Sequence, residues 1–488
     1  MFTSTFLAAA ALVPSVFAQN SETVLGVYMF HRHGDRTAKS TPPANLTDLG
    51  YMQVYTSGQY YRNRYISSDA SLKINGINTD LVKQSQIAVS APDDTVLMNS
   101  ATGFLQGLYP PVPTTSQLRD GTNVTAPMGG YQLIPVDLVD NGGGSEDSGW
   151  LQSTSNCAKS TISSNNYFTS AEYLQKLDST KQFYTDLFPV INATFNQSQN
   201  TFKNAYTIFD LINVAEIHNQ TIPSSDLLTN ETLFQLRTLA DAHEWGLAYN
   251  ASDDMRAIAG KTLAAQIVQF LNGTLTGNGK QKIGIQFGAY GTFASFFGLA
   301  DLPGVNENFT GVADYASAMT FELFTNGTAA QEISSTNYPA DEDVYVRFLF
   351  HNGTTTNSSE PVAYPLFGSG KDALSWNDFA DGMNKFAVGT TKEWCTACGN
   401  FTGTCAAYAP EGSASGSSSG NGSESGSGSG NGLSPAVNGV IGAMVTLAVV
   451  LGLEALIMAV GGMRLVSKKR LAHGSPAVSV DGNGAMKA

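Results

Sequence analysis

The sequence predicts an α/β fold, a mostly parallel sheet flanked by helices, with an α-helical insertion domain. Two observations support this class. Short apolar runs rich in β-forming residues alternate with longer segments of helical periodicity. From about residue 158 to about residue 280 the pattern is mainly helical, which indicates the insertion.

The predicted elements follow in order along the chain. Residues 23–30 form a buried strand, and a helix capped by Thr47 or Asp48 then runs towards Tyr65. The later elements are a strand at 87–90, a helix ending at 107, a strand at 282–287, a helix at 292–299 and a strand at 344–350. A charged segment begins at His31, directly after the first strand, and open α/β sheets bind ligands at such strand ends.

The N-terminal segment predicts export from the cytoplasm. Residues 1–18 carry no charge, contain an apolar stretch and end in the small-residue pattern Val16-Phe17-Ala18. This pattern favours a signal peptide cleaved after Ala18 over a buried N-terminal helix. The ectodomain would then span residues 19–410.

The C-terminal segment predicts a membrane anchor. Val440 to Val460 is apolar except for Glu454, and a helix of this length spans a bilayer core of roughly 30 Å. Basic residues follow the apolar run, so we expect a transmembrane helix at 438–463 and a cytoplasmic tail at 464–488. The chain would be a single-pass type I protein of the plasma membrane. A glycosylphosphatidylinositol signal is the alternative, but such signals end in their hydrophobic run.

The composition predicts a linker between the ectodomain and its anchor, and it argues against a nucleic-acid partner. Residues 411–435 are mostly Ser, Gly and Asn, which is typical of a flexible linker. The net charge is -14, and the ectodomain sequence has no basic patch, so a nucleic-acid partner is not expected.

The four cysteines predict two disulfides in an exported chain. Three pairings are possible, and each joins Cys157 to one of Cys395, Cys398 and Cys405. One bridge would therefore tie the middle of the chain to the end of the ectodomain. Cys395 and Cys398 have redox-motif spacing, but no Cys or His pair matches them at zinc spacing, which favours a structural role. Many glycosylation sequons indicate a glycosylated surface, including those at Asn45, Asn123, Asn192, Asn230, Asn250, Asn308, Asn352 and Asn400.

The residue types needed for phosphate chemistry gather in Arg32-His33-Gly34-Asp35-Arg36. A neutral imidazole can attack a phosphate monoester, and flanking arginines give bidentate hydrogen bonds to phosphate oxygens. Gly34 lets the backbone come close to the ligand. Attack by His33 would give a phosphohistidine that water hydrolyses, and an acid must protonate the leaving alcohol. A solvated charged loop is the alternative, but the position after a buried strand favours the site.

The segment from Phe30 to Thr37 resembles the signature of the histidine acid phosphatases, the branch that includes phytases. Four further segments are similar to the family. The first contains Leu46, Thr47, Gly50 and Gln53, and the others are residues 62–65, residues 99–101 together with 107–110, and residues 345–347. The resemblance covers most of residues 24–410 and matches the insertion poorly. It implies a histidine-phosphatase-like α/β core with a helical second domain, no metal or other cofactor, and phosphate or a phosphomonoester as ligand. It also implies His33 as the nucleophile, with Arg32 and Arg36 as substrate-binding residues.

The sequence departs from the family at further pocket positions. Thr95 falls closest to the place of a third arginine, and Tyr290 and Gly291 stand where a His-Asp pair supplies the proton donor. Ala38 replaces a proline after the motif. Loss of a general acid costs about 10²–10⁴ in rate, and loss of one donor to the transition state about 10²–10³. Efficient hydrolysis of alkyl phosphates by the family mechanism is therefore not expected.

Candidates for a replacement acid are few. His243 and Glu244 lie in the insertion and are predicted to form a surface pair. Asp35 is expected to orient His33 or an arginine rather than to donate a proton, and an ordinary tyrosine pKa near 10 makes Tyr290 a poor acid.

Two functions follow from these residues. One is a cell-surface phosphatase that binds, and slowly hydrolyses, phosphate monoesters through His33. The alternative is a catalytically inactive pseudophosphatase ectodomain with a binding or structural role. The sequence leaves the oligomeric state open.

Overall fold

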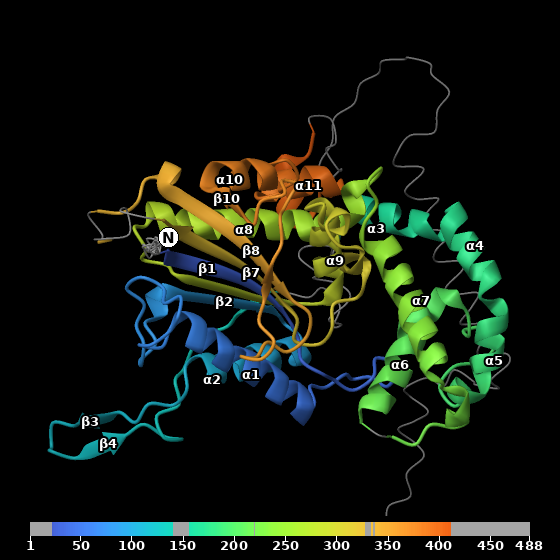
Figure 1. Cartoon of the computed structure of the whole chain (residues 1–488), viewed down its shortest axis with the longest axis horizontal. Helices are drawn as coiled ribbons and strands as arrows, with labels where there is room; N and C mark the ends of the chain where they lie inside the picture. Colours follow the sequence, from blue (N-terminus) through green and yellow to red (C-terminus); the bar gives the residue numbers. More distant parts are fainter. Residues whose placement is uncertain (1–21, 140–155, 219, 327–332, 335–336, 411–488) are drawn as a thin grey trace, which may run out of the picture. The chain divides into compact units, whose positions relative to one another are not determined.

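The computed structural model describes residues 22–139, 156–218, 220–326, 333–334 and 337–410. Within these residues an eight-stranded sheet has the order β10-β8-β7-β1-β6-β2-β5, with β9 paired to β8 (Figure 1). The strands are β1 (Thr23–Arg32), β2 (Ile87–Pro92), β5 (Asp137–Val139), β6 (Ile283–Gly288), β7 (Ala318–Thr325), β8 (Val344–His351), β9 (Val362–Ala363) and β10 (Ala373–Ser375).

Helices cover both faces of this sheet, as Figure 1 shows. On one face lie α1 (Asp48–Tyr65) and α2 (Thr95–Leu108), and on the other α8 (Ile258–Thr276), α9 (Tyr290–Leu299) and α10 (Trp376–Asn384). Val27 and Met29 of β1 pack on the α1 and α2 side, whereas Tyr28 and Phe30 pack on the α8 and α9 side. A strand buried on both faces explains why the chain is apolar throughout this segment.

The predicted α/β class is confirmed, and the sheet is mixed. In the described part of the chain, β1, β6, β2 and β5 pair in parallel, while β7, β8, β9 and β10 make antiparallel pairs. β7 was not among the predicted elements, because Glu322 interrupts its apolar run. That carboxylate is fully buried and forms ion pairs with Arg64 of α1 and Arg347 of β8.

The helices that stand apart from the sheet have their own core, which contains Tyr184, Phe202 and Leu236. They are α3 (Ala158–Asn165), α4 (Ala171–Ser179), α5 (Lys181–Ile191), α6 (Ala205–Ile217) and α7 (Asn230–Ala248). The insertion was expected to reach about residue 280, but Leu263 and Leu271 of α8 share the core of the sheet. The separate helical region is therefore α3 to α7.

The remaining elements lie at the edges. β3 (Thr115–Gln117) and β4 (Asn123–Thr125) form a separate two-stranded hairpin, and α11 (Thr391–Cys398) follows α10. In the parts of the chain that the structure describes, no helix is both long and apolar enough to cross a membrane. The predicted signal peptide, linker, transmembrane helix and cytoplasmic tail lie outside the described residues.

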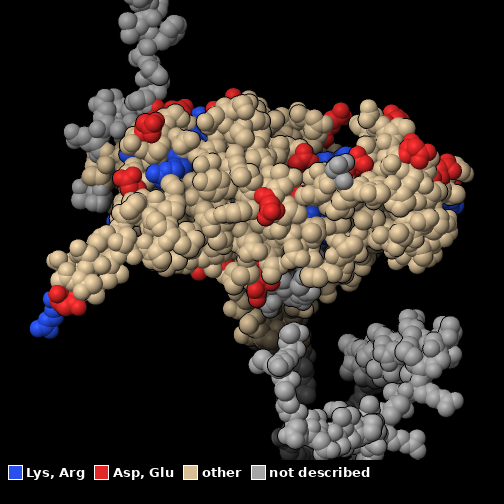
Figure 2. Space-filling view, turned by 90° about the horizontal axis from the view of Figure 1, so that it is seen from below, with Lys and Arg blue, Asp and Glu red and all other residues tan. Residues whose placement is uncertain are grey.

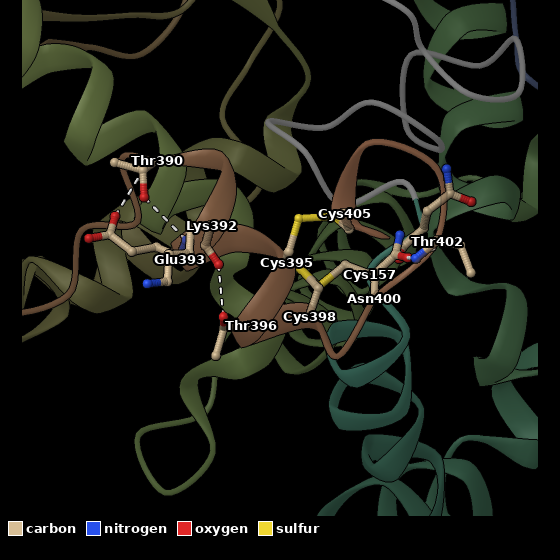
Figure 3. The surroundings of a disulfide bond; sticks show 11 residues. Cys157, Thr390, Lys392, Glu393, Cys395, Thr396, Cys398, Asn400, Thr402 and Cys405 are labelled. Atoms are coloured by element: carbon tan, nitrogen blue, oxygen red, sulfur yellow. Dashed lines mark hydrogen bonds between the residues drawn. A yellow bond between two sulfur atoms is a disulfide. The ribbon is translucent and has the colours of Figure 1, made fainter. Parts of the chain in front are cut away.

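Two disulfides hold the C-terminal end of the described residues, which confirms the prediction of two bridges. Cys157, directly before α3, joins Cys398, and Cys395 joins Cys405, so both bridges meet at α11 (Figure 3). The first closes a separation of 241 residues and ties the helical region to the C-terminal part. On the face that Figure 2 shows, basic side chains are few and acidic ones are scattered, consistent with the net charge of -14.

Candidate active site

The predicted motif lies at the carboxyl end of β1, beside the end of β6. These strands are parallel, and Arg32 pairs in register with Gly288. Because α9 begins just after β6, Tyr290 comes close to the motif, with the guanidinium carbon of Arg32 5.3 Å from its ring centroid. The topology therefore brings the motif and the start of α9 to one edge of the sheet, where α/β folds bind ligands.

His33 is fully buried in this loop. Its Nδ1 lies 2.7 Å from the carbonyl oxygen of Gly34. A carbonyl only accepts hydrogen bonds, so Nδ1 carries the hydrogen and the neutral ring has its lone pair on Nε2. This tautomer is the one in which Nε2 can attack an electrophile.

Arg32 is held by uncharged groups among the described residues. Its Nη1 donates to the carbonyl oxygen of Ala313, and its Nη2 lies 3.4 Å from the hydroxyl oxygen of Tyr206. The ring centroid of Tyr315 is 4.6 Å from the guanidinium carbon, in a cation–π arrangement. Arg32 therefore keeps its full charge for an anion.

Arg36 is held by a carboxylate instead. Its Nη1 donates to both carboxylate oxygens of Asp210, at 2.8 and 3.1 Å. Asp210 lies on α6, is 2% exposed, and also accepts a hydrogen bond from the backbone N–H of Lys39 at 2.8 Å. A buried carboxylate paired in this way fixes the guanidinium and compensates its charge.

Asp35 makes its side-chain hydrogen bonds to groups at the ends of two helices. Its Oδ2 accepts hydrogen bonds from the hydroxyl of Thr47 and from Nε2 of His218, the latter at 2.7 Å. Thr47 caps α1, and His218 follows α6, so Asp35 joins the motif to both helices. The carboxylate was expected to orient His33 or an arginine, whereas its hydrogen bonds are made to the supporting helices.

Gly34 has a role that differs from the predicted one. A Cβ on Gly34 would lie 2.2 Å from the carbonyl oxygen of Gly50, and a Cβ on Gly50 would lie 2.0 Å from that of Asp35. The two glycines let the motif loop and the first turn of α1 pack backbone against backbone. Gly34 is therefore required by this contact within the fold, whereas the sequence suggested close approach to a ligand.

Thr95 and Tyr290 stand where the resemblance leads one to expect a third arginine and the histidine of the proton-donor pair. Thr95 is exposed at the first turn of α2. Tyr290 is 5% exposed, and its hydroxyl donates to Oε2 of Glu244 at 2.8 Å. The predicted surface pair of His243 and Glu244 is wrong, because their side chains are only 7% and 15% exposed and Glu244 contacts Tyr290. Helical periodicity alone did not reveal that this face of α7 packs against α9.

A cavity of about 240 Å³ opens beside Arg32. It is just smaller than the roughly 300–1,000 Å³ of sites for drug-sized ligands, and of the three predicted site residues only Arg32 lines it. Its lining includes Arg32, Tyr206, Asp210, Arg237, Asp314 and Tyr315. Burial raises the pKa of Tyr206, of Tyr290 and of Tyr315, so these phenols stay neutral hydrogen-bond donors over the physiological range. Within the described ranges, no three His, Cys, Asp or Glu side chains gather to hold a metal ion.

Three residues near the motif were not predicted from the sequence. Tyr206 and Asp210 come from α6, and Tyr315 comes from the loop before β7, where its ring centroid is 5.6 Å from that of His33. One signal was present, because Asp210 is a lone acid within an apolar helical run. An unpaired buried carboxylate is costly, so such a residue points to a buried cation.

Comparisons with known proteins agree with the fold. The sequence model of one protein family, the histidine phosphatase superfamily (branch 2), matches residues 41–351. This range begins after the Arg32–Arg36 motif, so the match does not depend on the motif. Prostatic acid phosphatase from Bos taurus is 25% identical over 315 residues, covering 61% of this chain and 73% of that protein. The Homo sapiens protein is 27% identical over 241 residues, covering 46% and 55%. Among solved structures, a phytase from Klebsiella sp. ASR1 has a TM-score of 0.50 at 11% identity and covers 75% of this chain and 97% of its own.

Proposed function

Because this chain belongs to branch 2 of the histidine phosphatase superfamily, we propose that it binds phosphate monoesters at the Arg32–Arg36 loop and slowly hydrolyses them. Arg32 and Arg36 bind the phosphate, and His33 is the nucleophile. The similarity to prostatic acid phosphatases supports this reaction class.

The observation that carries the proposal is the hydrogen bond between Nδ1 of His33 and the carbonyl of Gly34. It fixes the ring in the tautomer with a lone pair on Nε2. In the first step Nε2 forms a bond to phosphorus while the ester P–O bond breaks. In the second step water attacks phosphorus, the P–N bond breaks, and phosphate leaves.

The reaction is expected to be slow, because two parts of the family site are missing. Thr95 provides no third guanidinium, and Tyr290 and Gly291 do not reproduce the His-Asp pair. An ester with a good leaving group needs little protonation and should be the best substrate.

The test is hydrolysis of p-nitrophenyl phosphate by the ectodomain at acid pH, with glycerol phosphate for comparison. We expect slow release of p-nitrophenol, a much slower reaction of glycerol phosphate, and no activity in His33→Ala. The variant should unfold at the same urea concentration as the parent, which separates loss of chemistry from loss of fold. Undiminished activity in a folded His33→Ala protein would remove His33 from the mechanism.

A second candidate function is a pseudophosphatase that binds anions without turnover. The observation that favours it is the buried ion pair of Arg36 and Asp210, which leaves Arg32 as the motif arginine without a carboxylate partner among the described residues. This function predicts that inorganic phosphate binds in a calorimetric titration, that Arg32→Ala loses the binding, and that no phosphate ester is cleaved. Hydrolysis that depends on His33 would exclude it.

We further propose that the chain is exported and anchored in the plasma membrane as a type I protein by residues 438–463. The two disulfides support export, because disulfides persist in oxidising compartments. The sequon asparagines named above are exposed or half-buried, as glycan attachment requires. Glycosidase treatment should lower the apparent mass of the membrane-bound chain, and a soluble cytosolic chain with free thiols would contradict the proposal.

A further inference from the structure

A carboxyl group from the helical region reaches the edge of the candidate active site. Oε2 of Glu244, on α7, accepts a hydrogen bond from the hydroxyl of Tyr290 at 2.8 Å. Its other oxygen, Oε1, lies 2.7 Å from Nδ1 of His243. The carboxylate is therefore fixed from both sides, and one of its two hydrogen bonds leads to the first residue of α9.

Tyr290 lies beside Arg32, one of the two arginines proposed to bind phosphate, and Tyr206 links it to the other, Arg36. Its ring centroid is 5.3 Å from the guanidinium carbon of Arg32 and 4.6 Å from the ring centroid of Tyr206. The hydroxyl of Tyr206 in turn lies 3.4 Å from Nη2 of Arg32 and 3.5 Å from Nη2 of Arg36. The ring of Tyr290 therefore packs directly against Arg32 and is linked to Arg36 through one side chain, Tyr206.

The two groups differ in burial, as a relay requires. Tyr290 is 5% exposed, and burial together with the neighbouring Glu244 raises its pKa, so it stays protonated. The Glu244 side chain is 15% exposed, so it lies closer to solvent than Tyr290 does. Tyr290 alone is a weak acid, but a protonated carboxyl group at its oxygen can return the proton as soon as it is given up.

We infer that Glu244 and Tyr290 together replace the missing proton donor, with Tyr290 as the catalytic residue and Glu244 as the residue that reprotonates it. The inference rests on the proposed function. As the ester P–O bond breaks, the leaving oxygen takes the proton of the Tyr290 hydroxyl, and the Tyr290 oxygen takes the proton of the Glu244 carboxyl. Glu244 is left as a carboxylate. When water attacks the phosphohistidine, the Tyr290 oxygen takes a proton from the water and its own proton passes to Glu244, which restores both groups.

The test compares phenyl phosphate, which has a poor leaving group, with p-nitrophenyl phosphate, which has a good one. Glu244→Gln keeps an oxygen that accepts from Tyr290 but cannot deliver a proton, and Tyr290→Phe removes the hydroxyl. Both variants should lose about 10²-fold in kcat/KM on phenyl phosphate and less than about threefold on p-nitrophenyl phosphate. Glu244→Asp should restore part of the lost rate.

Tyr206→Phe is the matched control, because it also removes a phenol beside Arg32 but has no part in the relay. It should lower kcat/KM for both esters by the same factor. If Glu244→Gln and Tyr290→Phe also act equally on both esters, the two residues only support the site and the inference is overturned. If the parent protein cleaves neither ester, the proposed function fails as well, so the two failures are distinguishable.

Discussion

His31 shows how one buried side chain couples the motif to pH. It lies before Arg32, is fully buried, and packs against the rings of Phe104 and Phe287. Its Nδ1 is 2.6 Å from the carbonyl oxygen of Arg32, so the ring supports the backbone that leads to His33. Burial lowers the pKa of His31 from 6.5 to about 4, because the charged ring would lose its hydration.

This pKa predicts a loss of stability in acid. Between pH 6.5 and about 4 the unfolded chain binds a proton at His31 that the folded chain does not, so stability falls as the pH falls. His31 alone should account for about 3 kcal/mol between pH 7 and 4. Urea unfolding of His31→Gln should show a pH dependence reduced by about that amount. An unchanged pH dependence would mean that His31 is not the responsible group.

At the scale of elements, the motif loop and α1 act as one unit. Thr47 caps α1 and also donates to Asp35, while Gly34 and Gly50 bring the two backbones into direct contact. His33, the proposed nucleophile, is therefore positioned by direct packing of the strand end against the helix start, which any added Cβ would separate.

A pair of glycine substitutions tests this packing. Gly34→Ala should cost about 2–3 kcal/mol of unfolding free energy or more, since its Cβ would meet backbone atoms of Gly50 at 2.2 Å. Gly273→Ala is the control, because Gly273 lies within α8 and its Cβ would meet only the side chain of Gln281, at 3.4 Å. The control should be neutral or stabilising by up to about 1 kcal/mol. Equal effects of the two substitutions would argue against this packing.

Local pattern predicted the elements that alternate between apolar strand and amphipathic helix, and Thr47 was one of the two residues it offered as the cap of α1. It did not predict β7, because Glu322 makes this strand look unsuited to burial until Arg64 and Arg347 are known to pair with it. A buried strand that carries a charged residue cannot be predicted from local pattern when the partners of that charge lie far away in the sequence.

The same limit applies to the site. Arg32, His33 and Arg36 lie within five residues and could be named from the sequence. Asp210, Tyr315 and the contact between Glu244 and Tyr290 join segments far apart in the chain, and only the packing of the helical region against the sheet brings them together.

At the scale of the whole molecule, the site lies where the helical region meets the sheet, so its geometry depends on how firmly the two are held together. Arg36 reaches Asp210 on α6, and Tyr290 reaches Glu244 on α7. The Cys157–Cys398 bridge ties the start of the helical region to α11 (Figure 3).

The two disulfides should therefore differ in their effect. In the chain-entropy model, the bridge closing 241 residues stabilises by about 5 kcal/mol and the one closing 10 residues by about 3. We expect Cys157→Ser with Cys398→Ser to lower the unfolding free energy more than Cys395→Ser with Cys405→Ser, and to lower activity as well. Denaturant unfolding and p-nitrophenyl phosphate turnover of the two double variants check this. A larger loss in the second pair would mean that local packing outweighs loop closure.

His33 is the residue proposed to carry the phosphoryl group. The direct measurement is to quench the protein with alkali during turnover of p-nitrophenyl phosphate, digest it, and locate the phosphoryl group by mass spectrometry, since phosphohistidine survives alkali. We expect one phosphoryl group on His33, absent from His33→Ala. Turnover with the phosphoryl group on another residue, or with no phosphoenzyme at all, would contradict the account.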